Sequence, residues 1–367
     1  MSRASSTPVV EAHPAGEDDD HHGLELNPRG LAVVAAFVAA AAVALYLLLP
    51  QFAGLDDTWR RIEQGSPAWL ALAALCTVLM FAGYVALFKA VFSTVRLDWR
   101  ESYQITMAAL AASRLLSAGG AGGVVLQAWA LRRAGMPTRE VADRTVTFIV
   151  MTYLVYTGSV VAFGYALHWG LLPGAHPWAL TFIPATVALV VTAFGLSLAF
   201  VPPDLQRRMD AYCSEEGGRL RRVVAKAARV PATISAGMRE ALRRLASRDP
   251  SILGALLFWA GQIAALWASF RAFGSSPPLA VLVLGFFVGM LGNLLPLPGG
   301  VGGVDAGMIG TFAAFGVDFG LATVAVLAYR AFTFWLPTVP GVIAYLQLRR
   351  TVDRWREERR KAPAPAV

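Results

Sequence analysis

The sequence predicts an all-α, polytopic membrane protein with about six membrane spans and two re-entrant hairpins that form an inverted repeat. Three observations lead to this fold class. The 367 residues are 56% hydrophobic and only 15% charged, with a mean hydropathy of +0.54, whereas soluble domains carry about 25% charged residues. Several apolar runs reach the roughly 20 residues that a helix needs to cross a bilayer. Two further apolar segments are interrupted by glycine-rich turns.

Six apolar segments are expected to cross the membrane as helices, because each is close to or above the required length. The last of them should be bent by Pro337 and Pro340, since proline removes a backbone donor and crowds the preceding turn. The predicted spans are Leu31–Pro50, Pro67–Phe92, Thr145–Trp169, Trp178–Val201, Ile252–Phe273 and Leu321–Leu348.

Three hydrophilic segments are expected outside this transmembrane domain of residues 31–348. Residues 1–30 carry a net charge of −4 and are predicted to be a disordered tail rather than a signal peptide. Residues 202–250, inserted in the domain, hold eleven Lys and Arg. Their helical periodicity with basic faces predicts helices on an anionic membrane surface, or otherwise a solvated loop helix. Residues 349–367 form a basic C-terminal tail.

The distribution of Lys and Arg predicts the orientation, because positive residues accumulate in cytoplasmic loops. The alternate connections hold only Arg60, Arg61 and Arg271. Both termini are therefore expected in the cytoplasm of a multi-pass plasma membrane protein, and the two hairpins would enter from opposite sides. The Arg-rich segments on the predicted cytoplasmic side are 93–102, Arg132–Arg144, 202–250 and the C-terminal tail.

The two interrupted segments resemble each other. LLSAGGAGGV (115–124) and LPLPGGVGGV (295–304) share a GG-x-GGV core at an offset of 180 residues. The half-helices beside the first core are too short to cross a bilayer, which favours re-entrant hairpins over the alternative of two short crossing helices. Matching segments that enter from opposite sides are typical of an inverted-topology repeat.

The hairpin tips are the predicted functional centre. Glycines there free N–H groups at the start of each second half-helix, where the helix dipole favours anions; otherwise they only allow tight turns and close packing. Asp305 follows the second glycine turn and is a functional carboxylate, a capping residue or both. Arg330 lies about nine residues into the last span. An arginine at that depth needs a partner, either Asp305 or a lipid phosphate.

No metal, cofactor or nucleic acid partner is expected. The sequence has no HExxH, GxSxG or nucleotide-binding motif, so catalysis is not predicted. The expected partners are membrane lipids with anionic headgroups, and the oligomeric state stays open. The candidate substrate-binding residues are Arg114, Gly119, Gly120, Gly122, Gly123, Gln127, Asn293, Pro296, Pro298, Gly299, Gly300, Gly302, Gly303, Asp305, Tyr329 and Arg330.

The motif PLPGGVGGVDAGMIG, followed by AYRAFTFWLPTVPG, resembles the lysylphosphatidylglycerol synthase transmembrane family, also called flippase-like, over about residues 30–350. In members with a fused aminoacyl-transferase domain, the resemblance implies that the membrane part moves aminoacylated phosphatidylglycerol to the outer leaflet. This chain ends at Val367, so we expect no aminoacyl-transferase domain. It also has Asp305 where the family has Glu, and the first repeat lacks the matching proline.

Three functions remain open at this stage. The first is binding and translocation of an anionic phospholipid or lipid-linked substrate through a polar cavity at the hairpin tips. The second is a lipid-binding scaffold for a separately encoded glycosyltransferase or other lipid-modifying enzyme. The third is an intramembrane transferase that acts on polyprenyl phosphate. A closed, dry core between the hairpins would favour the scaffold, and acidic pairs facing a basic cytoplasmic site would favour the transferase.

Overall fold

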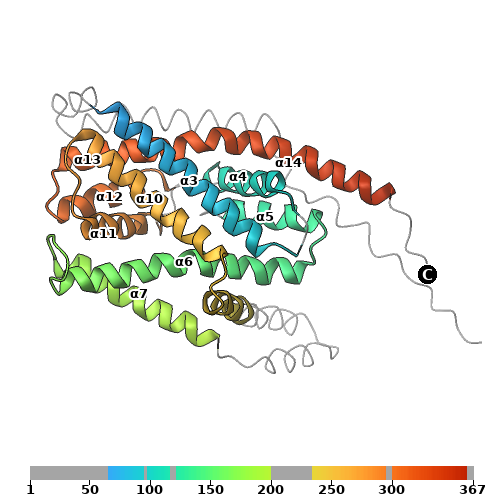
Figure 1. Cartoon of the computed structure of the whole chain (residues 1–367), viewed down its shortest axis with the longest axis horizontal. Coiled ribbons are helices and arrows are strands. Elements are labelled where there is room, and N and C mark those ends of the chain that lie inside the picture. The colour runs from blue at the N-terminus through green and yellow to red at the C-terminus, as the bar shows by residue number, and fades with distance from the viewer. Residues whose placement is uncertain (1–64, 95–96, 116–120, 200–233, 295–299, 362–367) are drawn as a thin grey trace, which may run out of the picture.

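The computed structural model describes residues 65–94, 97–115, 121–199, 234–294 and 300–361, and the regular secondary structure of these residues is helical, without strands. A further helix covers residues 234–246, η2 (Met290–Leu294) is a 3₁₀ turn, and η4 (Ala331–Trp335) is a π-helix. The labelled helices (Figure 1) are α3 (Pro67–Val91), α4 (Trp99–Leu115), α5 (Ala121–Arg133), α6 (Thr138–His168), α7 (Trp178–Leu198), α10 (Ser251–Phe273), α11 (Leu279–Gly289), α12 (Gly303–Ala314), α13 (Phe319–Arg330) and α14 (Leu336–Lys361).

Five segments of the described chain are long and apolar enough to cross a membrane. They are α3, α6, α7, α10 and the continuous helical stretch Phe319–Glu358, which contains α13, η4 and most of α14. The predicted first span, Leu31–Pro50, lies outside the described residues. The all-α membrane fold class is thus confirmed.

Glycines allow the closest helix pair, α3 and α10, to touch backbone to backbone. A Cβ added at Gly83 would lie 3.0 Å from the carbonyl oxygen of Gly254. One added at Gly254 would lie 2.9 Å from the amide nitrogen of Leu87, and one at Gly261 would lie 3.0 Å from Cα of Met80. Such small-residue contacts bring helices together where lipid provides no hydrophobic driving force.

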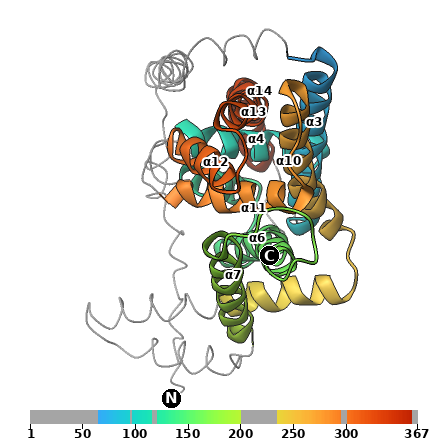
Figure 2. The ribbon, with the colours of Figure 1, turned by 90° about the vertical axis from the view of Figure 1, so that its left-hand side faces the viewer.

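The helix α11 lies at the centre of the larger core cluster. Nine of its eleven residues are buried, and its neighbours are α6, α10 and α12. Figure 2 shows α11 passing between α6 and the pair α12 and α13. Eleven residues extend about 16 Å as a helix, which is half of a hydrocarbon core. The apolar helical segment continues through η2 to Leu294 and is still shorter than the ~20 residues of a full span.

Each interrupted segment folds into a pair of packed helices, α4 with α5 and α11 with α12. In the second pair, Gly289 approaches Met308 while Gly292 approaches Gly303. Contacts of this kind, in which one residue number falls as the other rises, define an antiparallel hairpin. The helical hairpins are present as expected, and their re-entrant position in a membrane stays a prediction.

The C-terminal segment differs from the expected tail. Helix α14 continues to Lys361, well past the predicted boundary at residue 348. The hydroxyl of Thr351 donates to Oε1 of Gln104 at 2.9 Å, and Nε1 of Trp355 donates to Oε1 of Glu101 at 3.1 Å. These bonds hold the polar end of α14 along α4, so it does not separate from the bundle. Helix α6 likewise begins at Thr138, seven residues before the predicted span.

The described part of the basic segment packs against the bundle. In the helix 234–246, Met238 and Ala241 are buried, and a Cβ on Gly237 would lie 2.5 Å from a methyl of Val146 in α6. Arg244 donates to Asp249 at 3.3 Å and to the carbonyl of Ala90 at 3.3 Å. This helix is therefore anchored by protein contacts, whereas the expectation was a membrane-surface or solvated helix.

Candidate functional site

A buried ion pair joins the second hairpin to the following helix. Nε of Arg330, the last residue of α13, donates to Oδ1 of Asp305 in the first turn of α12 at 2.8 Å. Asp305 is 2% exposed and Arg330 is 8% exposed. A charge at this depth is costly without a partner. Of the two partners expected for Arg330, Asp305 or a lipid phosphate, the structure shows the ion pair with Asp305.

The backbone turn before α12 places the carboxylate of Asp305. Gly300 and Gly302 have φ values of +67° and +82°, the left-handed region that glycine adopts without strain. The N–H of Gly302, the residue before α12, then donates to Oδ2 of Asp305 at 2.8 Å. One carboxylate oxygen thus caps the helix and the other binds Arg330. The capping and ion-pair roles of Asp305 occur together.

A proline in the last span creates an acceptor that the first hairpin satisfies. Pro337 has no N–H to donate to the carbonyl of Thr333, four residues earlier. Nη2 of Arg114, at the end of α4, donates to this carbonyl at 2.9 Å. Its Nη1 donates to the carbonyl of Phe334 at 2.6 Å and to the hydroxyl of Thr338 at 3.1 Å. Arg114 therefore links the first hairpin to the break in the last span.

The same break brings the two arginines to one aromatic ring. The guanidinium carbon of Arg114 lies 4.7 Å from the centroid of Phe334, and that of Arg330 lies 4.2 Å from it. Phe334 belongs to the π-helix η4, and π-helical turns within α-helices are frequent at functional sites. With Asp305, the group carries a formal charge of +1 in the interior of the bundle.

Two buried donors of the predicted site lack a partner. Nη2 of Arg330 and Nε2 of Gln127, in α5, are buried and form no hydrogen bond within the described structure. A buried donor without an acceptor is unfavourable by about 1–3 kcal/mol, and by more when it is charged. The arrangement can therefore accept an anionic oxygen at Arg330. Gln127 forms no hydrogen bond with either arginine, so it is a separate donor on the first hairpin.

The remaining predicted residues are divided between the hairpin tips and the core. Asn293, in η2, is exposed, and its Oδ1 lies 2.5 Å from the position that a Cβ on Gly300 would take. Tyr329 is buried and donates its hydroxyl hydrogen to Gln262 of α10, so its hydroxyl is already bonded within the core. Gly119, Gly120, Pro296, Pro298 and Gly299 lie outside the described residues.

The other predicted glycines set the closeness of the hairpins. A Cβ added at Gly123 would lie 2.4 Å from the carbonyl oxygen of Ala109, and one added at Gly292 would lie 2.1 Å from the carbonyl oxygen of Gly303. Gly123 and Gly303 are separated by 180 residues, the offset of the sequence repeat. Gly122 is buried in the first turn of α5, and its repeat equivalent, Gly302, directly precedes α12. Gly123 and Gly303 thus both lie at close helix contacts within their own hairpins, although their contact partners are not equivalent in the repeat.

Sequence reasoning missed Thr333, Phe334, Thr338 and Gln262, which supply acceptors or the shared ring. Pro337 could have indicated the two carbonyl acceptors, Thr333 and Phe334, because a proline inside a buried helix leaves a carbonyl that needs another donor. No comparable local pattern marks Gln262, which meets Tyr329 through the packing of α10 on α13.

Comparison with known proteins agrees with this architecture. The model of the family described as lysylphosphatidylglycerol synthase TM region matches residues 24–341. Two proteins named UPF0104 membrane protein, from Methanothermobacter thermautotrophicus, are similar along most of their length. One is 27% identical over 339 residues, covering 85% of this chain and 92% of the relative. The other is 23% identical over 340 residues, covering 87% and 95%. This chain belongs to the lysylphosphatidylglycerol synthase transmembrane family.

Proposed function

We propose that this integral membrane protein binds an anionic phospholipid or lipid-linked substrate and moves its headgroup across the bilayer at the hairpin tips. The observation that carries the proposal is the buried, unpartnered Nη2 of Arg330 beside the Asp305 ion pair and Arg114. A phosphate oxygen is the acceptor that best suits a guanidinium, because it accepts charge-assisted and bidentate hydrogen bonds.

Each residue has a distinct role in this proposal. Arg330 binds the phosphate with Nη2 while Asp305 holds Nε and fixes the orientation of the guanidinium. Arg114 keeps the break in the last span in place and adds positive charge to the site. The acyl chains stay in the bilayer, because only the headgroup needs a polar route. The formal charge of +1 is matched by one phosphodiester.

The alternative of a lipid-binding scaffold has its own supporting observation. Arg114 donates to three acceptors at the break in the last span, the carbonyls of Thr333 and Phe334 and the hydroxyl of Thr338. A site closed by so many direct bonds suits a protein that holds a lipid without moving it. Transport requires these bonds to open, whereas a scaffold requires them to persist.

The deciding experiment measures lipid movement in proteoliposomes at equal amounts of folded protein. We expect Arg330→Lys to lower the rate about tenfold or more, since it keeps the charge but loses the planar donors. Arg330→Met should abolish movement. Arg350→Lys, at an exposed position near the end of α14, is the matched control and should leave the rate unchanged. Equal rates for wild type and both Arg330 variants would contradict the proposal, and a folded wild type without lipid movement would favour the scaffold.

The inverted orientation of the hairpins is tested by cysteine labelling. Ala121→Cys and Val301→Cys occupy equivalent positions 180 residues apart, in a background with Cys76 and Cys213 replaced by Ala. A membrane-impermeant maleimide should reach Val301→Cys from outside and Ala121→Cys only from the cytoplasmic side. Reaction of both from one side would exclude the inverted repeat.

A further inference from the structure

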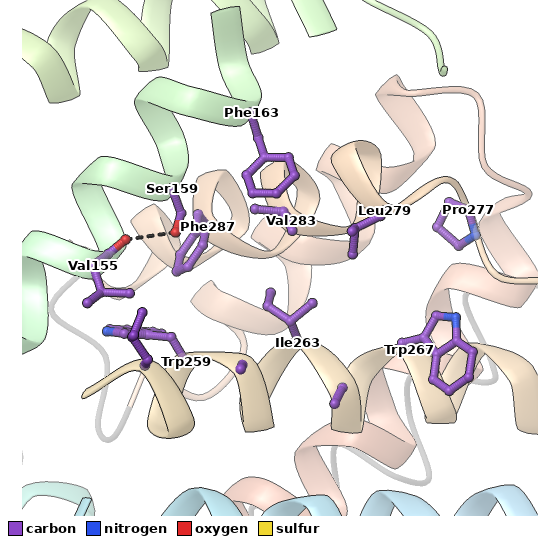
Figure 3. A pocket seen from close by; sticks show the side chains of 13 residues that line it. Val155, Ser159, Phe163, Trp259, Ile263, Trp267, Pro277, Leu279, Val283 and Phe287 are labelled. Carbon is purple, nitrogen blue, oxygen red and sulfur yellow. Dashed lines mark hydrogen bonds between the residues drawn. The ribbon is translucent and has the colours of Figure 1, made fainter. Parts of the chain in front are cut away.

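A groove between α6, α10 and α11 has a cavity volume of about 600 Å³, within the range of ligand pockets. Figure 3 shows its two ends, with Trp259 and Phe287 at one and Trp267 and Pro277 at the other. Its lining is almost entirely apolar. The one hydroxyl in it, on Ser159, donates to the carbonyl of Val155 at 2.8 Å. The groove therefore suits an apolar occupant.

The length and position of the groove match one leaflet. On α10 its lining runs from Leu256 to Trp267, which corresponds to about 16 Å of helix. That length is about half of a hydrocarbon core of ~30 Å. Pro277 and Leu279 place one end of the groove where α10 ends and α11 begins. The distribution of Lys and Arg predicts this end to face outward.

The side chain of Arg271 lies near this end of the groove. Arg271, in the last turn of α10, is exposed and makes no ion pair with any residue that the structure describes. Its guanidinium carbon lies 5.8 Å from the ring centroid of Trp267 and 5.4 Å from that of Trp69. The two tryptophans pack edge to face, 5.1 Å apart. Tryptophan favours the headgroup level of a membrane, so Arg271 is held where a lipid phosphate lies.

We propose that this groove holds one acyl chain of an anionic glycerophospholipid whose phosphate binds Arg271. The site is separate from the ion pair of Asp305 and Arg330 and does not depend on translocation. The apolar wall accounts for the chain, and Arg271, which has no ion-pair partner among the described residues and lies over the ring of the lining residue Trp267, accounts for the anionic headgroup. Helix α7 itself contains no Lys or Arg between Trp178 and Leu198, so ordinary boundary lipid is expected at its exposed apolar face.

The test uses the full chain in nanodiscs that contain phosphatidylglycerol with a diazirine on one acyl chain. After irradiation, peptide mapping should place adducts on the groove-lining parts of α10 and α11. Ala260→Phe fills the groove from an exposed position and should lower this labelling several-fold, as should the smaller change Ala264→Leu. Ala193→Phe, at an exposed position on α7, is the matched control and should change nothing.

The headgroup is tested with the same acyl chain on phosphatidylcholine. Arg271→Gln should lower groove labelling by phosphatidylglycerol about fivefold and leave labelling by phosphatidylcholine unchanged. Arg350→Gln should alter neither. The proposal is overturned if α7 and the groove are labelled equally in wild type and in Ala260→Phe, or if Arg271→Gln does not change the preference. Disulfide formation between Ala260→Cys and cysteines placed in 35–45, with no lipid adduct in the groove, would instead make the first predicted span the occupant.

Discussion

The first hairpin, α4 with α5, and the second, α11 with α12, are both closely packed but contribute different chemistry. Gly123 meets Ala109 in the first, and Gly289, the repeat equivalent of Ala109, meets Met308 in the second, so the two hairpins pack closely in different registers. Helix α4 nevertheless carries Glu101, Gln104 and Arg114, each bonded to the last span or its extension. Helix α11 has no charged residue and is buried on nearly all sides.

The difference shows how the site at Arg330 is assembled. In the second half the charge is balanced locally, because Asp305 of α12 pairs with Arg330 of the next helix. In the first half Arg114 has no carboxylate partner among the described residues and donates to backbone acceptors in the other half. Both halves thus have close helix packing, but they differ in how their charges are balanced. The result is one asymmetric site rather than two equivalent ones.

The largest effect is expected from breaking the local ion pair. Asp305→Leu leaves Arg330 buried without its carboxylate, which should lower the free energy of unfolding by about 3–5 kcal/mol. Replacing both residues, in Asp305→Leu with Arg330→Met, should restore most of that loss because no buried charge remains. Equilibrium unfolding in mixed micelles measures both values. A double variant as unstable as the single one would show that the two residues are not coupled. Asp305 would then not balance the charge of Arg330 within the second half.

The shared packing is tested by adding one methyl group to each hairpin. A Cβ at Gly292 would overlap the backbone of Gly303, and one at Gly123 would overlap Ser113 and the carbonyl of Ala109. Both Gly→Ala changes should lower the free energy of unfolding by about 1–3 kcal/mol. The loss should be greater at Gly292, because its two nearest atoms both belong to the backbone, at 2.1 and 2.5 Å, whereas the nearest atom at Gly123 is the side-chain oxygen of Ser113 and the backbone oxygen of Ala109 lies at 2.4 Å.

Gly158→Ala is the matched control for both hairpins. This residue lies within α6 and has nothing within 4 Å of its added Cβ. The change should therefore stabilise the protein by about 0.5–1 kcal/mol through helix propensity. If Gly123→Ala were as well tolerated as Gly158→Ala, the two hairpins would not share their packing.

The fold could be predicted largely from hydropathy. Predicted and observed bounds agree within three residues for α3, α7 and α10, because the edges of those spans coincide with the change from apolar to polar sequence. The prediction failed where polar helix turns are held by tertiary contacts. The end of α14 is hydrophilic, and only its hydrogen bonds to Gln104 and Glu101 explain why it stays beside α4.

The site could be predicted in part. Asp305 and Arg330 were identifiable because an ionisable residue in an apolar segment needs a partner, and few candidates are available. Thr333 and Phe334 were not identifiable as acceptors from composition, since the atoms that matter are backbone carbonyls. Their exposure to Arg114 depends on a π-helical turn, whose position is set by the packing of the whole segment.

The smallest effect gives the most specific test of the link between the halves. Arg114→Met should destabilise the protein because the carbonyl of Thr333 loses a donor that Pro337 cannot replace. Pro337→Ala returns an N–H four residues after Thr333, where a helical hydrogen bond can form. The loss caused by Arg114→Met should therefore be smaller by about 1 kcal/mol in the Pro337→Ala background. Equilibrium unfolding of the wild type, both single variants and the double variant gives this coupling.

The corresponding cycle with Pro340→Ala is the control, since Arg114 makes no hydrogen bond to Leu336, four residues before Pro340. Additive losses in the Pro337 cycle would mean that Arg114 does not compensate for the proline, and the two halves would then be joined by packing alone.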